Sequence, residues 1–206
     1  MSNASTSHFD AAAKDWDQRP MSVQLAQVTQ PIWSNISLDR TQHWLDFGAG
    51  TGLLSLPLAE RVAQVTALDT STEMLAVLAG KNLANIQTLN QDVFLGLPAQ
   101  YHGMISCMAL HHVADTDALL AVFARHLLPE GQLVLIDLYA EDGSFHGDNQ
   151  AKGVQHLGFD PETLKAQVEA AGLVDVVIQP LDELAHRNGR NYPLFILTAT
   201  QPARRI

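Results

Sequence analysis

The sequence has one cysteine, Cys107, among its 206 residues. A single cysteine cannot form an internal disulfide or a cysteine-rich metal cluster, so neither holds this fold together. One free cysteine suits a reducing compartment, and the polar first residues lack the basic start and apolar core of a signal peptide. We therefore predict a cytoplasmic protein.

Long apolar runs and basic residues are scarce as well. No stretch of about 18 consecutive apolar residues occurs, which argues against a membrane-spanning helix. Twelve Lys and Arg residues stand against 22 Asp and Glu residues, so the formal net charge is −10 at pH 7. A polyanion would meet net repulsion, and the visible basic groupings are two pairs, Arg187 with Arg190 and Arg204 with Arg205. We therefore expect no nucleic-acid partner.

Apolar patterning divides the chain into two parts. Residues 1–40 carry a mostly helical rhythm of apolar positions, interrupted by Pro20 and Pro31, and are expected to form a helical cap. From residue 41 onward short apolar runs alternate with helical segments. This pattern predicts one α/β domain over residues 41–206, doubly wound around a mostly parallel seven-stranded sheet. The strands are expected at residues 44–47, 65–68, 86–89, 104–107, 133–138, 174–178 and 194–200.

Helix boundary signals accompany these strands. The helix after the first strand is expected at 53–61, where Pro57 either lies in the first turn or kinks the helix. Thr70 and Glu73 form a capping-box pattern, which predicts that Thr70 caps the next helix. Further helices are expected at residues 116–128 and 161–171.

The segment after the first strand, residues 46–52, reads Asp-Phe-Gly-Ala-Gly-Thr-Gly. Its alternating glycines let the backbone bend sharply and approach a ligand closely, since no Cβ intervenes. Free amides at the start of the following helix favour an anionic group. A glycine-rich turn is also typical of a tight strand-to-helix connection, so the loop alone does not identify a ligand site.

Acidic residues lie at the ends of three successive predicted strands. Asp46 precedes the first glycine, where a carboxylate can face the ammonium group of an amino-acid moiety. Asp69 ends the second strand, where an acid can accept hydrogen bonds from both hydroxyls of a ribose. Asp92 follows the third strand, where it can accept a hydrogen bond from an adenine amino group. Each aspartate alone is more typical of a cap or turn, but with the glycine loop they indicate a ligand with an amino-acid end and a nucleoside end.

With these motifs the sequence resembles the class I S-adenosylmethionine-dependent methyltransferases, in particular the small-molecule branch that includes ubiquinone- and menaquinone-biosynthesis-like enzymes. The resemblance covers residues 41–138 well, and residues 45–52 look like the family's first motif. It implies S-adenosylmethionine as cofactor, S-adenosylhomocysteine as product, and an antiparallel final strand. The implied cofactor-binding residues are Asp46, Gly48, Ala49, Gly50, Asp69, Thr70, Met74, Asp92, Val93, Cys107 and Met108.

One further segment fits the resemblance, and one position departs from it. Residues 106–113 are similar to the segment that passes beneath the methionine part of the cofactor. The family usually has an aromatic–acidic pair just before the fourth strand, whereas this chain has Tyr101 and His102, so no acid is assigned there. Phe9 and Trp16 in the N-terminal segment either close over the cofactor or pack in the core.

Two neighbouring histidines, His111 and His112, follow the fourth strand, where one of them can face the methyl acceptor as a general base. Packing or capping roles are the alternative. Together with His102, His146 and His156, this pair could suggest a metal site. Adjacent histidines after a strand point in different directions, however, and the sequence has no HExxH spacing, so we expect no metal site.

The expected function is direct in-line transfer of a methyl group from S-adenosylmethionine to a small-molecule acceptor. One alternative is a non-catalytic S-adenosylmethionine-binding module that acts through a protein partner. A nicotinamide dinucleotide oxidoreductase is less favoured, because its G-x-G-x-x-G fingerprint would need glycine or alanine at Leu53 or Ser55. The sequence specifies neither the acceptor nor the oligomeric state.

Overall fold

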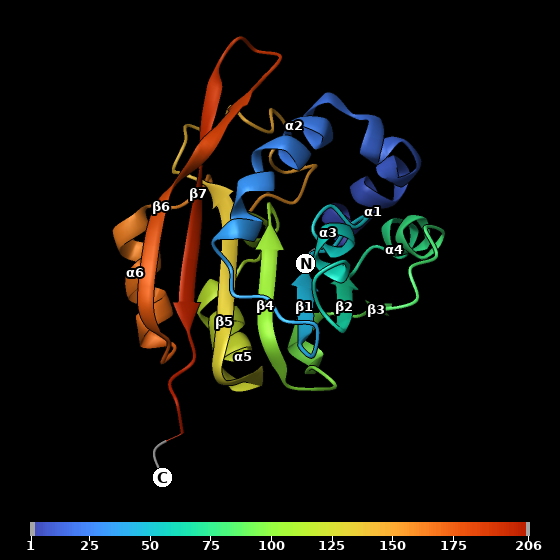
Figure 1. Ribbon diagram of the computed structural model, residues 1–206. Coiled ribbons are helices and arrows are strands. Elements are labelled where there is room, and N and C mark those ends of the chain that lie inside the picture. The colour runs from blue at the N-terminus through green and yellow to red at the C-terminus, as the bar shows by residue number, and fades with distance from the viewer. Residues whose placement is uncertain (1–2, 205–206) are drawn as a thin grey trace.

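The computed structural model describes residues 3–204 and contains a seven-stranded sheet in the order β3-β2-β1-β4-β5-β7-β6 (Figure 1). Neighbours from β3 to β5 pair in parallel, and β7 pairs antiparallel with both β5 and β6. The predicted doubly wound, mostly parallel sheet with its antiparallel final strand is confirmed. The strands are β1 (His43–Phe47), β2 (Gln64–Asp69), β3 (Ile86–Asn90), β4 (Tyr101–Cys107), β5 (Leu127–Leu138), β6 (Val174–Ala185) and β7 (Asn191–Thr200).

The strand order reverses between β1 and β4, which lie side by side in the middle of the sheet. In open α/β sheets, ligands bind in the crevice outside the carboxyl ends of the strands at this reversal. Figure 1 shows the N-terminal helices, in blue, above the arrowheads of β1, β4 and β5. The N-terminal segment therefore covers the end of the sheet where a ligand is expected.

Alternate side chains along the strands pack mostly into two large hydrophobic clusters, one on each face of the sheet, and Ala67 of β2 belongs to a small third cluster. On β1, Trp44 belongs to one cluster, and Leu45 and Phe47 belong to the other. Burial on both faces explains why these strands are short apolar runs in the sequence. The helical segments are α1 (Asn3–Ala12), η1 (Ala13–Gln18), α2 (Pro20–Val28), η2 (Gln30–Ser34), α3 (Ser55–Ala59), α4 (Thr72–Ala79), η3 (Val93–Leu95), η4 (Leu110–His112), α5 (Thr116–His126) and α6 (Pro161–Ala170), where η marks a 3₁₀ helix.

Helix α3 is shorter than the predicted 53–61 because of Pro57. Proline has no amide to donate to the carbonyl of Leu53, so it is tolerated only in the first turn. The helix begins at Ser55, which places Pro57 in that turn. This is one of the two placements expected from the sequence.

The predicted cap of helix α4 is wrong by one residue. Ser71, not Thr70, is the N-cap, and its Oγ accepts a hydrogen bond from the amide of Met74 at 3.1 Å. The Asp69 carboxylate accepts a hydrogen bond from the Ser71 amide at 2.8 Å. This bond holds Thr70 in the connection between β2 and the helix, so the helix starts one residue later.

The C-terminal hairpin is longer than predicted. β6 continues to Ala185, beyond the predicted end at 178, and β7 begins at Asn191 rather than 194. The extension rises above the sheet beside α2 (Figure 1). Gln24 of α2 exchanges two hydrogen bonds with the Ala185 backbone, at 3.0 and 2.9 Å. The extension therefore rests on the N-terminal segment, a contact that no local apolar pattern reveals.

We call residues 3–34 the N-terminal cap, and they form the helices α1 to η2. Pro20 begins α2, and Pro31 lies in the first turn of η2. The fully buried Ile32 belongs to the same cluster as Trp44, which anchors the cap to the sheet. Residues 1 and 2 of the predicted N-terminal segment lie outside the described residues. Within residues 3–204, no helix has both the length and the apolar character needed to cross a bilayer.

Candidate functional site

The glycine loop after β1 takes backbone conformations that side chains disfavour. Gly48, Gly50 and Gly52 have φ angles of 68°, 53° and 100°. A Cβ at Gly48 would lie 2.3 Å from the Cβ of Ala109, and one at Gly52 would lie 2.4 Å from Leu78 Cδ1. A Cβ at Gly50 would meet nothing within 4 Å. The outer two glycines therefore allow close packing, while the middle one leaves open space above the backbone.

A cavity of about 100 Å³, which we call the inner cavity, lies against this loop. Strands β2 and β4 and helix α4 contribute to its wall, and Phe9, Trp16 and Leu25 of the N-terminal cap contribute its roof. The predicted cofactor-binding residues that line it are Gly48, Ala49, Gly50, Asp69, Met74, Cys107 and Met108. Most of the predicted site is therefore brought to one place.

Asp69 connects the tips of β1 and β2. Its Oδ2 accepts a hydrogen bond from the Gly50 amide, and its Oδ1 accepts one from the Ser71 amide, both at 2.8 Å. Only 9% of the residue is exposed, and burial raises the pKa of its carboxyl above the usual value, although these amide bonds act in the opposite direction. The carboxylate therefore holds the glycine loop in place and also borders the cavity.

Asp46 lies beneath the glycine loop and is not part of the cavity lining. Its Oδ2 accepts a hydrogen bond from the Ser55 hydroxyl at 2.6 Å. Burial raises the pKa of the Asp46 carboxyl to about 7, with a further increase from the charge of Asp69 and an opposing effect of the Ser55 bond. The observed contact ties β1 to the start of α3.

The remaining predicted binding residues also lie outside the inner cavity lining. Asp92 caps η3 by accepting a hydrogen bond from the Phe94 amide at 2.9 Å, and Val93 is buried in the core. The Thr70 hydroxyl lies 3.5 Å from that of Thr6 in α1. Asp92 thus has the capping role that its sequence position alone favours.

Two aspartates of the N-terminal cap fasten it over the inner cavity. Asp10 accepts hydrogen bonds from the Ser71 hydroxyl at 2.6 Å and the Glu73 amide at 3.3 Å. Asp17 accepts one from the Thr51 hydroxyl and forms an ion pair with Lys81 at 2.6 Å. The sequence analysis missed these contacts, because nothing in the local pattern links the cap to loops more than 30 residues away.

A larger cavity of about 540 Å³, the outer cavity, lies next to the inner one. It is bounded by the N-terminal cap, η4, the loop after β5 and the tip of the β6–β7 hairpin. Its volume is in the range of sites that hold small molecules. The residues that line both cavities are Phe9, Trp16, Leu25, Met108 and His112. Because of this common wall, ligands in the two cavities would be neighbours.

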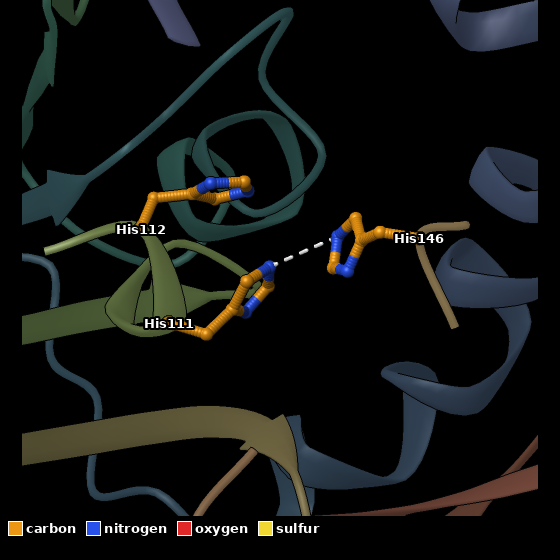
Figure 2. A group of neighbouring side chains, drawn as sticks. All are labelled: His111, His112 and His146. Atoms are coloured by element: carbon orange, nitrogen blue, oxygen red, sulfur yellow. Dashed lines mark hydrogen bonds between the residues drawn. The ribbon is translucent and has the colours of Figure 1, made fainter. Parts of the chain in front are cut away.

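His111 is held by a buried carboxylate. Its Nδ1 lies 2.7 Å from Asp137 Oδ1, and its backbone amide donates to Asp137 Oδ2 at 3.2 Å. A carboxylate only accepts, so in neutral His111 the proton is on Nδ1 and Nε2 carries a lone pair. Nε2 lies 3.2 Å from His146 Nε2, as the dashed line in Figure 2 shows. His146, in the loop after β5, therefore donates this bond when both rings are neutral.

His112 and His146 are both neutral at pH 7. Burial, followed by the effect of His111, lowers the pKa of His112 to about 3. The same two causes, in the same order, lower the pKa of His146 to about 2. The His112 ring also packs edge-on against Phe9, with centroids 5.3 Å apart. A neutral imidazole thus lies on the wall between the two cavities.

His111, His112 and His146 each offer a nitrogen atom, and these atoms lie within 4.8 Å of one another (Figure 2). In residues 3–204, they are the group that could hold a metal ion. The sequence offered His146 as one of several candidate ligands, but no metal-ligand spacing linked it to the adjacent pair, and only the fold brings the three rings together. The expectation that no metal binds stays a prediction.

Comparisons with known proteins agree with this geometry. Residues 45–135 match a family model described as a methyltransferase domain. An uncharacterized methyltransferase of Schizosaccharomyces pombe is 30% identical over 139 residues, which are 58% of this chain and 49% of the relative. A ubiquinone biosynthesis O-methyltransferase of Coxiella burnetii is 34% identical over 137 residues, 61% of this chain and 57% of the relative. The chain thus spans about half of the curated relatives it matches.

Solved structures show the same fold at low identity. A putative methyltransferase in complex with the Haloferax volcanii Trm112 activator has a TM-score of 0.79 at 18% identity, covering 94% of this chain and 97% of that chain. The DhpI–SAH complex has a TM-score of 0.76 at 20% identity, covering 98% and 97%. The predicted resemblance to the class I S-adenosylmethionine-dependent methyltransferases is confirmed, and the matched residues 45–135 include the glycine loop.

Proposed function

We propose that this protein transfers a methyl group from S-adenosylmethionine to a small-molecule acceptor by direct in-line displacement. The observation that carries the proposal is the common wall between the two cavities, which includes Met108 and His112. A cofactor at the glycine loop and an acceptor in the outer cavity would meet at this wall. Transfer between bound molecules needs this proximity.

The residues of the inner cavity fit the two ends of the cofactor. Gly48 to Gly50 offer backbone that a ligand can approach closely, with open space above Gly50. Asp69 and Met74 would border the adenosyl part, and Cys107 and Met108 the methionine part. For Asp46, Thr70, Asp92 and Val93 we retain the predicted binding roles, which would require these side chains to act from positions outside the present lining.

When bound, the sulfonium supplies an already activated methyl group. The protein's part is to hold the acceptor in line and to exclude water. His112 faces both cavities, so it is the histidine placed to accept the proton of an oxygen or nitrogen acceptor. Its pKa of about 3 makes it a weak base in this state, and the role requires the bound acceptor to raise that pKa. Asp137 fixes the ring of His111, which in turn orients His146 in the outer cavity.

Two measurements test the proposal. Calorimetry with S-adenosylhomocysteine should give saturable binding, and S-adenosylmethionine with a broad acceptor panel should yield S-adenosylhomocysteine. Absence of binding at millimolar ligand would overturn the proposal. Binding without turnover on any acceptor would instead support the non-catalytic module that acts through a protein partner.

A further inference from the structure

The ionisable side chains that line the outer cavity are all basic. Three are arginine or lysine side chains, Arg19, Lys152 and Arg187, and the lining contains no Asp or Glu within the described part of the chain. The other ionisable lining residues are His8, His111, His112, His146 and His186. This composition is the opposite of the whole chain, in which acidic residues exceed basic ones by 22 to 12.

The three cations come from different elements and converge on one region. Arg19 precedes α2, Lys152 lies in the loop after β5, and Arg187 follows β6 at the hairpin tip. Burial lowers the pKa of Lys152, and repulsion from Arg187 and then Arg19 lowers it further, while Asp148 has a smaller opposing effect. The fold therefore holds positive charges close enough to repel one another.

The ion pairs found in residues 3–204 do not include any of these three cations. The Arg19 guanidinium instead lies over the Trp16 ring, 4.9 Å from its centroid. The Lys152 ammonium donates to the carbonyl of His146. Bringing like charges together costs free energy, and a bound anion would offset that cost.

We infer that the methyl acceptor is a small molecule with a carboxylate or phosphate-type oxyanion, bound in the outer cavity by Arg19, Lys152 and Arg187. This inference rests on the proposed methyl transfer. Guanidinium groups bind both kinds of oxyanion through paired hydrogen bonds, and an ammonium adds a point charge. The anionic end would lie at these cations, and the nucleophile would lie at the common wall beside His112.

The positive charges of the outer cavity also affect whether the three histidines His111, His112 and His146 can bind a metal ion. A divalent cation at His111, His112 and His146 would lie near Lys152, and near His8, which is positive when protonated; both charges lower the pKa of His146. These repulsions disfavour a metal and favour an anion. The 3.2 Å contact between His111 and His146 is then an ordinary hydrogen bond.

The direct test is calorimetry on the full chain saturated with S-adenosylhomocysteine, with inorganic phosphate in one arm and acetate in the other. The anion that binds with the lower dissociation constant identifies the anionic group of the acceptor as phosphate-type or carboxylate. Lys152→Met and Arg187→Gln should each weaken binding at least tenfold and leave S-adenosylhomocysteine affinity unchanged. Arg40→Gln, an exposed arginine outside both cavities, is the matched control and should bind like the wild type.

Turnover gives a second readout with matched acceptors, a hydroxy acid against its amide and a phosphonate against its neutral diester. The anionic member should have at least a tenfold higher kcat/KM, and Arg187→Gln should raise its KM more than it lowers kcat. Equal turnover of neutral and anionic acceptors, with no binding of either anion, would overturn the inference while leaving methyl transfer intact. Failure to bind S-adenosylhomocysteine would instead remove the proposed function.

Discussion

At the residue scale, the aspartates at the ends of β1 and β2 have different environments, although the sequence predicts that both bind the cofactor. Asp69 borders the inner cavity and holds the glycine loop, whereas Asp46 is buried beneath it with Ser55 as its partner. The sequence predicts at which strand end each aspartate lies, but not whether its side chain points into the cavity or beneath the glycine loop. That direction depends on the helix packed below the loop.

Replacing Asp69 tests its proposed contact with the adenosyl part. Asp69→Ala should weaken S-adenosylhomocysteine binding by about 1–3 kcal/mol, the scale of a lost charge-assisted hydrogen bond. Asp46→Ala should also weaken binding, and calorimetry on both variants measures the loss. Unchanged affinity for Asp69→Ala would refute its role, and intact affinity for Asp46→Ala would leave Asp46 as a support of the loop.

A second prediction at this scale concerns His112. His112→Asn should lower kcat by about 10²–10⁴, the usual contribution of general acid–base catalysis, because it removes the proposed proton acceptor. The dissociation constant of S-adenosylhomocysteine should change far less. His126→Asn, in the last turn of α5 and outside both cavities, serves as the control. A His112→Asn enzyme with wild-type kcat would rule out the base assignment.

At the element scale, the N-terminal cap determines access to the inner cavity. The cavity measures about 100 Å³, below the roughly 300–1,000 Å³ typical of ligand sites. The cap residues Phe9 and Trp16 pack edge-to-face in its roof, 5.4 Å between ring centroids. Cofactor binding should therefore require the cap to move outward.

Loosening the cap should reveal this movement. Asp17→Ala removes the contacts with Thr51 and Lys81, so amide hydrogen exchange in α1 and η1 should increase and S-adenosylhomocysteine should associate faster. Asp15→Ala, two positions away in η1, is the control. The cap has no gating role if Asp17→Ala changes neither exchange nor association rate.

Local signals predicted the sheet and most helices, since most strands contain a short apolar run and most breaks have a glycine, proline or cap. They failed where tertiary contacts determine the boundary. The β6–β7 extension depends on Gln24, and the start of α4 depends on Asp69. His146 and Lys152 joined the site for the same reason, because only the fold brings the loop after β5 to η4.

At the scale of the whole molecule, two neutral histidines, the buried His112 and the half-buried His146, couple stability to pH. An unfolded histidine titrates near pH 6.5, whereas the pKa is about 3 for His112 and about 2 for His146. At a pH between the folded and unfolded pKa values, the unfolded chain binds more protons than the folded protein. The stabilisation is therefore complete above pH 6.5 and is lost as the pH falls toward 3.

The free energy of unfolding should thus decrease on acidification by about 1.4 kcal/mol per pH unit for each of these histidines. Asp46, with its raised pKa, acts in the opposite direction between about pH 4 and 7. Comparing wild type with His146→Gln by urea unfolding at pH 7.5 and 5 cancels that effect. The variant should lose less stability than the wild type, and equal losses would contradict the burial of a neutral His146.

The position of Cys107 makes its thiol a probe of the opening of the N-terminal cap. The thiol borders the inner cavity beneath the cap, and burial raises its pKa, so a maleimide or iodoacetamide reagent should react slowly while the roof is shut. Because no second thiol competes, the labelling rate of unmodified protein follows the opening of the roof. A bound cofactor should shield the Cys107 sulfur from the reagent. The fraction of labelled protein, measured by mass spectrometry, should therefore decrease as the fraction of protein with bound cofactor increases.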